Sequence, residues 1–430
     1  MRLVSIEAQG YQKAAGGIKI GFLRVSLVLV ASSALLLPRA SPAAAQVATA
    51  GSLTLQMAMD RALAANATIG AARLRGPINL ANLAVARERL NPEATVEIEK
   101  EAPKQAFGMA VPLDLGGKRG KRIAVAEATA RAGEAELAAT VAQVRNDVRR
   151  AYFGQLTAEA RLSLLQELRD LSMRARDTAQ ARFDAGSAPR LEVMQAQLAL
   201  AAAENEATAA ASVASAARAT LNALLGLSLD NATTLASGID TGEALSTPAA
   251  LAMASMASTE LALLDRQIEE QRARLVLAQA LRVPDAAPAF TLTRDAEPEF
   301  TYGWRAGIAV TLPLFTTHRA GVLVEQTTLD QLLAQRQARL VRIQGDVTAA
   351  SQRAQAQREL FVRYRDQIIP QAVQVEQLAQ DAYQLGQTGI AALLQALQAT
   401  RDVRLRSLDA IDAFQSAIVD LERAIGAPLP

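Results

Sequence analysis

Apolar residues recur along most of this chain at steps of three and four, the spacing that places them on one face of a helix. Uninterrupted patterns of this kind reach about 60 residues, on the order of 90 Å at 1.5 Å per residue. Helices of that length do not fit a compact globule, so the pattern predicts a long bundle or a tube. Two heptad-like seams are the clearest: Leu137, Val141, Val144, Val148 and Tyr152, and Ile411, Phe414, Ile418, Leu421 and Ile425.

Glycine and proline divide the helical pattern. Gly186 and Gly386 each lie between two seams, where the C-terminal cap of a helix favours a residue that tolerates a positive φ. The sequence therefore predicts two long helical hairpins, with tips at 186 and 386. Pro370 falls inside the helix that leads to the second tip and should kink it, because proline cannot donate a backbone hydrogen bond. Asp170 stands at the matching place before the first tip.

The chain repeats itself after about 200 residues, since residues 182–197 can be laid over residues 382–397. The order of prolines and glycines is kept on either side of this match. We interpret the chain as a tandem duplication, with a first repeat over 46–230, a linker over 231–247 and a second repeat over 248–430. The matched pairs are Gly186 with Gly386, Gly226 with Gly426, Pro112 with Pro313 and Pro92 with Pro284.

Each repeat also contains a segment of alternating character, which is typical of β-strands. We expect β-hairpins over 93–112 and 287–313, each placed before the long helix. From the pattern alone two interpretations stay open: part of the wall of an outer-membrane barrel, or a small two-layer sheet in a periplasmic domain. Four strands cannot close a barrel, for which about eight is the minimum, so a barrel would be shared between chains. The apolar even positions of the second hairpin are Phe290, Leu292, Phe300, Tyr302, Trp304, Ile308, Val310 and Leu312.

Residues 1–45 have the parts of a secretory signal peptide. Lys19 and Arg24 precede an apolar run of about 13 residues, and small residues ending at Ala45 follow it. We expect export and cleavage after Ala45. Beyond residue 46 we find no run of 18 apolar residues, so we expect no further membrane-spanning helix.

Composition and charge exclude several classes of function. Removing residues 1–45 leaves 40 Lys and Arg against 42 Asp and Glu, so no general basic surface for nucleic acid remains. Cysteine is absent, which excludes disulfides, thiol chemistry and an acylated N-terminal cysteine. The single histidine, His318, has no carboxylate beside it, and we expect a structural role for it. The sequence therefore predicts no enzyme, no cofactor and no metal site.

Four motifs occur in order along the chain: the opening helix at 53–66, Pro112–Arg119 at the start of a long helix, Ala181–Gly186 followed by Gln195–Gln197, and Ala382–Gly386 followed by Leu394–Ala396. Together they resemble the TolC family of outer-membrane efflux channels, in the branch that serves cation-exporting resistance–nodulation–division pumps. The resemblance covers residues 53–430. It implies a mainly α fold with a small β part: tandem helical hairpins forming a coiled-coil tube, and four short strands per chain in a homotrimeric 12-strand β-barrel.

The same resemblance implies a location and partners. The protein would lie in the outer membrane of a Gram-negative cell, with a tube in the periplasm. An inner-membrane pump and a periplasmic adaptor would deliver metal cations, and the adaptor would dock at the hairpin tips. The alternative is that the tip residues only turn the chain. The implied docking residues are Arg182, Phe183, Gly186, Ser187, Tyr383, Gly386, Gln387 and Thr388.

The sequence departs from the family pattern in three ways. The first hairpin is short, with strands of about six to eight residues where about nine to eleven are usually needed to span a bilayer. No cysteine is available for the N-terminal lipid that many relatives carry. The carboxylates that ring the aperture in relatives are reduced to Glu192, because Ala392 and Gln395 stand at the matching places of the second repeat. Glu192 is either an aperture carboxylate or a solvated helix residue.

A basic cluster marks the predicted start of the first long helix: Lys118, Arg119, Lys121 and Arg122. On the channel interpretation it lies at the periplasmic rim of the barrel, near lipid phosphate; otherwise it is an exposed helix start. Two other functions also remain open. A periplasmic adaptor subunit has long helical hairpins, and so does an exported coiled-coil structural protein. The duplication argues against the first of these, and the aromatic hairpin against the second.

Overall fold

The computed structural model describes residues 52–101, 103–236, 246–296, 300–312 and 314–429. The predicted signal peptide lies outside the described residues. So do residues 237–245 of the predicted linker and residues 297–299, where we expected the turn of the second hairpin.

Four antiparallel strands form one sheet in the order β1–β2–β3–β4, as the alternating segments predicted. The first two have six residues each (β1, Glu93–Ile98; β2, Gln105–Ala110), and the last two have twelve each (β3, Asp285–Ala296; β4, Phe300–Thr311). The first hairpin is therefore as short as expected. The hairpins of the two repeats are joined because β2 pairs with β3, with Phe107 opposite Leu292.

One face of the sheet is apolar and exposed. Residues directly opposite each other across the strands share a face, and one such row consists of Val96, Phe107, Leu292 and Trp304. Trp304 is 72% exposed and stacks on Phe290 with ring centroids 6.3 Å apart. The opposite face carries small and polar residues in matching rows: Thr95, Gly108 and Thr291, and Glu97, Ala106, Thr293 and Gly303. An aromatic face of this extent indicates an apolar partner outside the chain.

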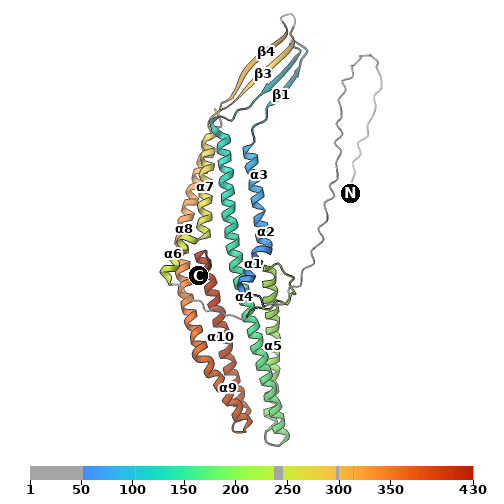
Figure 1. The fold of residues 1–430 in the computed structure, drawn as a ribbon, viewed down its shortest axis with the longest axis vertical. Coiled ribbons are helices and arrows are strands. Elements are labelled where there is room, and N and C mark those ends of the chain that lie inside the picture. The colour runs from blue at the N-terminus through green and yellow to red at the C-terminus, as the bar shows by residue number, and fades with distance from the viewer. Residues whose placement is uncertain (1–51, 102, 237–245, 297–299, 313, 430) are drawn as a thin grey trace, which may run out of the picture. The chain divides into compact units, whose positions relative to one another are not determined.

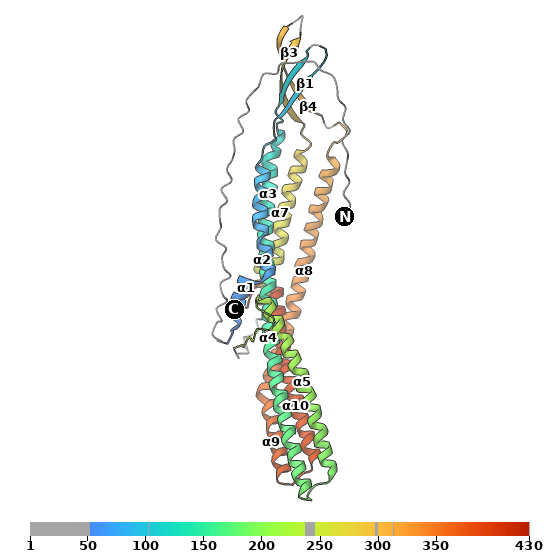
Figure 2. The same cartoon turned by 90° about the vertical axis from the view of Figure 1, so that its right-hand side faces the viewer.

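Four helices continue from the strands as a single layer (Figures 1 and 2). Within it α3 contacts α4, α4 contacts α7, and α7 contacts α8. Their bounds are Arg75–Arg87 for α3, Lys118–Asp184 for α4, Thr259–Ala280 for α7 and Arg319–Arg363 for α8. A short 3-10 turn, Leu115–Gly117, leads into α4, whose 67 residues give it a length of about 100 Å.

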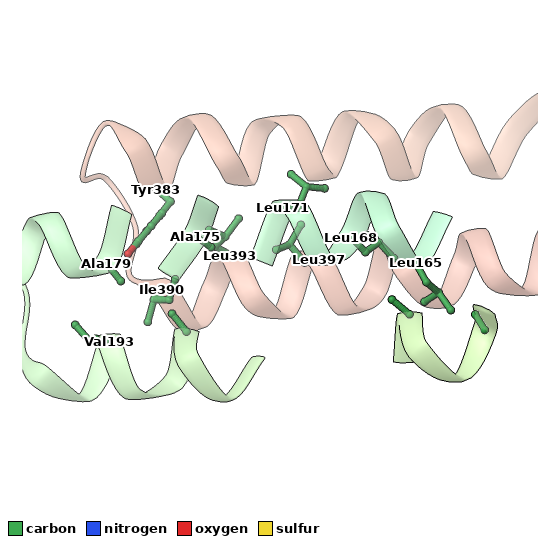
Figure 3. Packing of buried hydrophobic residues seen from close by; sticks show 13 residues of the cluster. Leu165, Leu168, Leu171, Ala175, Ala179, Val193, Tyr383, Ile390, Leu393 and Leu397 are labelled. Carbon is green, nitrogen blue, oxygen red and sulfur yellow. The ribbon is translucent and has the colours of Figure 1, made fainter. Parts of the chain in front are cut away.

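Three further helices pack with the second half of α4 to form the two hairpins. They are α5 (Arg190–Leu224), α9 (Ile369–Gln384) and α10 (Ile390–Ile425). Figure 3 shows the core between them, in which leucines of α4 face Leu393 and Leu397 of α10, with Tyr383 at the tip end. Alanines of α5, among them Ala196, Ala207 and Ala210, complete this core. Their small side chains let the helices approach closely.

Short helices lie around the middle of the layer: α1 (Leu55–Ala65), α2 (Ala67–Arg73) and α6 (Thr247–Ala257). They cover two more cores. In the first repeat, Ile69 packs with Val148, Tyr152 and Leu221. In the second, Ala250 and Ala254 pack with Val347, Phe414 and Leu421.

The helical segment before the first strand of each repeat is divided into separate helices. Asn66 accepts hydrogen bonds from the backbone of Thr68 (2.9 Å) and Ile69 (3.3 Å), and so starts a new helix. Ser258 caps α7 in the same way. A glycine packs beside each break: a Cβ would lie 2.9 Å from the Ala65 carbonyl oxygen at Gly226, and 2.8 Å from that of Ala257 at Gly426. The two repeats thus share a junction that the sequence did not reveal.

Pro370 interrupts its helix, as predicted. A π-helical turn, Tyr364–Ile368, separates α8 from α9. The wider turn is explained by the proline, which cannot donate to the Asp366 carbonyl and whose ring would clash with it. At the matching place in the first repeat, α4 passes Asp170 without a break.

One helical stretch of the described chain, Thr247–Ala280, is long and apolar enough to cross a membrane by length and composition alone. The stretch contains no run of 18 apolar residues, and our expectation of no membrane-spanning helix after residue 46 stays a prediction. The stretch is not one helix, because the cap at Ser258 divides it into α6 and α7. α7 also carries Glu260, Asp265 and Arg266 near its start, and only 22% of the apolar window is buried. Broken backbone and charges of this kind are unfavourable in hydrocarbon.

The glycine junction gives a first prediction. Gly426 has a φ of 85°, so Gly426→Ala should destabilise the protein by about 1–2 kcal/mol from backbone strain alone, and by more from the clash with Ala257. Gly345→Ala is the control, because Gly345 lies inside α8 with open space around its Cβ position; it should stabilise by about 0.5–1 kcal/mol. Denaturation midpoints of both variants provide the measurement, and equal midpoints would contradict this account.

Candidate functional site

Each helical hairpin turns at a glycine with positive φ, 73° at Gly186 and 71° at Gly386. This conformation confirms the reason for expecting glycine there. At both tips the residue after the glycine donates to the carbonyl five residues back, and the glycine donates to the carbonyl three back, which is a Schellman motif. The bonds are Ser187 to Arg182 (2.7 Å) and Gly186 to Phe183 (2.8 Å), and Gln387 to Ala382 (2.9 Å) and Gly386 to Tyr383 (3.1 Å).

The eight predicted tip residues divide into two sets. Five face outward and are exposed: Phe183, Gly186, Ser187, Gly386 and Gln387. Arg182 and Thr388 are half-buried, and Tyr383 is only 1% exposed. The first set is available to a partner, whereas the second set lies between the two hairpins.

Arg182 and Tyr383 join the two tips. The Arg182 guanidinium lies over the Tyr383 ring, 5.0 Å from its centroid, and donates to the Tyr383 backbone carbonyl at 3.4 Å. Cation–π contacts of this kind contribute roughly 0.5–2 kcal/mol, depending on how far the cation is desolvated. The contact links the end of α4 with the end of α9.

Glu192, in the first turn of α5, points into the same region. Its Oε2 atom is buried and has no hydrogen-bond partner in the described chain, and neither does the Tyr383 hydroxyl or the Thr388 Oγ1 atom. Burial raises the pKa of Tyr383, and the Glu192 carboxylate raises it further, while Arg182 acts in the opposite direction. No ion pair between Glu192 and Arg190 is present among the described residues. Buried oxygens without partners are costly, so these three groups are available to accept a hydrogen bond from a donor outside the described chain.

A second buried ionic cluster lies between the tip and the π-helical turn. Glu376 of α9 is buried and contacts Arg404 of α10 at 3.2 Å, and Arg404 contacts Glu167 of α4 at 3.1 Å. Burial raises the pKa of Glu376, Arg404 lowers it, and Glu167 raises it again. Our sequence analysis missed this cluster. A signal was present, because Glu376 occupies one position of the otherwise apolar seam Ile369, Ala372, Glu376, Ala379 and Tyr383.

The basic cluster at the start of α4 does not form an exposed helix start. Lys118 is buried and donates to Asp285 at 2.6 Å, which ties α4 to the first residue of β3. Arg122 makes two hydrogen bonds to Asp114, of 2.9 and 3.2 Å. Arg119 donates to the Arg87 carbonyl, and Lys121 to that of Gly116. These side chains fix the junction between strands and helices.

His318 is half-buried and precedes α8 with a φ of 54°. Its side chain does not cap the helix. Within the described residues no group of three or more His, Asp or Glu side chains could hold a metal ion.

The buried Glu376 generates a second prediction. A folded-state pKa above the unfolded value of about 4.3 contributes stability that is present at low pH and is lost as pH rises through the folded-state pKa. Glu376→Gln stays neutral at every pH, so the free energy of unfolding of this variant relative to the original chain should increase as pH rises above about 4.3. Denaturation midpoints measured from acid to neutral pH give the difference.

The matched control is Thr400→Val, which removes an uncharged hydrogen bond to the Ala372 carbonyl in the same core. It should lower the midpoint by the same amount at every pH. If the difference in midpoint between Glu376→Gln and the original chain were equally independent of pH, the Glu376 carboxyl would not titrate over the pH values measured.

Comparison with known proteins agrees with this arrangement. Residues 58–227 match the family model described as outer membrane efflux protein. The cobalt-zinc-cadmium resistance protein CzcC of Cupriavidus metallidurans is 24% identical over 380 residues, which is 88% of this chain and 91% of that protein.

Solved outer-membrane channels share the fold. The channel OprN superposes with a TM-score of 0.71 at 18% identity, over 87% of this chain and 90% of OprN. CusC gives a TM-score of 0.71 at 16% identity, over 87% of this chain and 92% of CusC. The sequence motifs, the match of residues 58–227 and the common fold all point to similarity with the outer membrane efflux protein family.

Proposed function

We propose that this protein is the outer-membrane channel subunit of a tripartite efflux system, a passive exit duct for metal cations. The observation that best supports this function is the exposed apolar face of the sheet, whose strands lead directly into one layer of long helices. A sheet face with Trp304 and Tyr302 more than 70% exposed fits lipid, and α4, with a length of about 100 Å, fits a tube through the periplasm. The named metal-resistance relative supports metal cations as the substrate.

The chain has two open edges, and they argue for assembly with further copies. β1 and β4 end the sheet, and α3 and α8 end the helical layer. α3 buries no residue at all within the described chain, yet it exposes Leu74, Ile78 and Val85 by 57–64%. α8 exposes Leu323 and Val324 by 61–66%. These edges complement each other if α8 of one copy packs against α3 of the next.

Strand number favours three copies. Two chains would give eight strands, and an eight-stranded barrel is only wide enough to be filled by side chains. Three chains give twelve strands and leave room for a passage lined by the small and polar face of the sheet. The family resemblance implies the same number.

The exposed tip residues suit the adaptor, which would receive substrate from an inner-membrane pump. Phe183, Ser187 and Gln387 are open at the end of the tube farthest from the sheet (Figure 1). Arg182, Tyr383 and Thr388 would act indirectly, by holding the tips together. Glu192 would place one carboxylate per chain at the aperture. The exported chain would begin after Ala45 and carry no lipid.

A third prediction tests the assembly. The purified protein should be a trimer by native mass spectrometry in detergent, and it should fractionate with outer membranes. Ile78→Glu, on the exposed stripe of α3, should dissociate the trimer because it buries an unpaired charge between chains. Met256→Glu is the control, since Met256 is 89% exposed on α6 and belongs to neither α3 nor α8. A soluble monomer in the absence of detergent would rule out the channel.

A fourth prediction concerns the aperture. Glu192→Gln should lower the cation preference of the channel in planar bilayers, with a modest effect, because charges in a water-filled mouth are screened over about 8 Å at physiological salt. Glu204→Gln, twelve residues further along α5 and exposed, should change the preference much less. Unchanged selectivity in Glu192→Gln together with intact trimers would place the selective charge elsewhere.

A further inference from the structure

Positive charge is concentrated where the strands become helices. The four crossings between sheet and helices, residues 87–89, 114–122, 282–285 and 319, hold eight Lys and Arg against three Asp and Glu. The rest of residues 46–430 then holds 32 basic residues against 39 acidic ones. The charge of this band is therefore opposite in sign to that of the remaining chain.

Only some of these basic side chains have a partner within the chain. Lys118 and Arg122 neutralise Asp285 and Asp114, and Arg119 is held by the Arg87 carbonyl. Three exposed arginines, Arg89, Arg282 and Arg319, have no side-chain hydrogen bond or ion pair in the described part of the chain. The exposed acids at or beside these crossings are Glu88, Glu93 and Asp285, and Asp285 is paired with Lys118. We name Arg89, Arg282 and Arg319 the arginine band.

The three arginines lie at nearly one level along the helices. The bond from Arg119 to Arg87 brings the end of α3 beside the start of α4, and a Cβ at Gly116 would lie 3.0 Å from the Val283 side chain, which brings the end of α7 there as well. Gln271 donates to the Glu325 carbonyl at 3.0 Å. Because α7 and α8 run in opposite directions, this bond places Arg319 beside the last turn of α7. Along the helix axis Arg319 lies about 5 Å from the end of α7, at 1.5 Å per residue.

Large apolar side chains adjoin each residue of the arginine band. Phe315 is 98% exposed and Leu314 is 72% exposed, and both lie between the end of β4 and Arg319. Leu90 and Leu281 are exposed by 47% and 42% directly beside Arg89 and Arg282. Each arginine thus has an exposed apolar neighbour within a few residues. Apolar anchors next to cationic side chains are typical of the boundary between hydrocarbon and headgroups.

We propose that the arginine band binds the headgroups of anionic phospholipids in the leaflet nearest the helices, with Phe315 and Leu314 in the adjoining acyl region. This rests on the proposed placement of the sheet in a membrane. Guanidinium groups without protein partners match phosphate oxygens in charge and geometry. Each basic side chain near an anionic surface strengthens binding roughly fivefold. The band fixes how deeply the sheet enters the bilayer.

Native mass spectrometry tests this proposal on the full trimer. Trimers extracted from equimolar phosphatidylethanolamine and phosphatidylglycerol should retain phosphatidylglycerol preferentially, and high salt should remove the preference. The triple variant Arg89→Gln, Arg282→Gln, Arg319→Gln should lose it by roughly a factor of 10 to 100 while remaining trimeric. The control triple, Arg174→Gln, Arg272→Gln, Arg423→Gln, replaces exposed arginines elsewhere and should keep it. Glycerol phosphate should not compete, since the apolar anchors require a lipid.

The outcomes separate this inference from the function on which it rests. If the protein inserts into phosphatidylethanolamine vesicles but shows no preference for phosphatidylglycerol, lipid binding by the arginine band is wrong while the membrane placement stands. The same follows if the two triple variants retain equal amounts of phosphatidylglycerol. Competition by glycerol phosphate overturns the lipid as the occupant. Failure to insert into vesicles of either composition overturns the membrane placement and the band together.

Discussion

The pairing of β2 with β3 is the contact on which the rest of the chain depends. These strands belong to different repeats, and six residue pairs join them, from Gln105 opposite Arg294 to Ala110 opposite Ala289. Because α4 follows β2 and α7 precedes β3, the pairing places these helices side by side. The bond from Thr129 to Glu270, at 2.9 Å, continues the register along them. Without this pairing each repeat would hold an isolated hairpin, which is marginally stable at best in water.

Features that one residue determines through its own backbone could be predicted from the sequence. Gly186 and Gly386 turn the chain because other residues are strained at positive φ, and Pro370 interrupts a helix because it lacks a donor. The breaks at Asn66 and Ser258 could not be predicted, since the apolar pattern continues across both and only a local cap stops the helix. The burial of Lys118 depends on Asp285, which is 167 residues away and becomes a neighbour only when the sheet has formed.

The candidate site shows the same division. The turns at the tips could be predicted. The contact of Arg182 with Tyr383 could not, because it forms only when the two hairpins pack together and the sequence pattern does not show which residues then meet. The buried Glu192, Tyr383 and Thr388 oxygens near this contact have no hydrogen-bond partner in the described chain. The ion pair of Glu376 with Arg404 likewise joins two helices, α9 and α10, and forms only when they pack.

Low aromatic content and the single-layer architecture have one physical origin. A wall one helix thick has little interior, so few aromatic side chains are buried among the helices; Phe361 and Phe414 stack with ring centroids 6.2 Å apart where α8 meets α10. Elsewhere alanine suffices and keeps the wall thin. Such a wall cannot cover its own edges: α3 packs on α4 but buries no residue of its own. Its apolar stripe must be covered by another chain, so the stability of the fold and the formation of the assembly are one equilibrium.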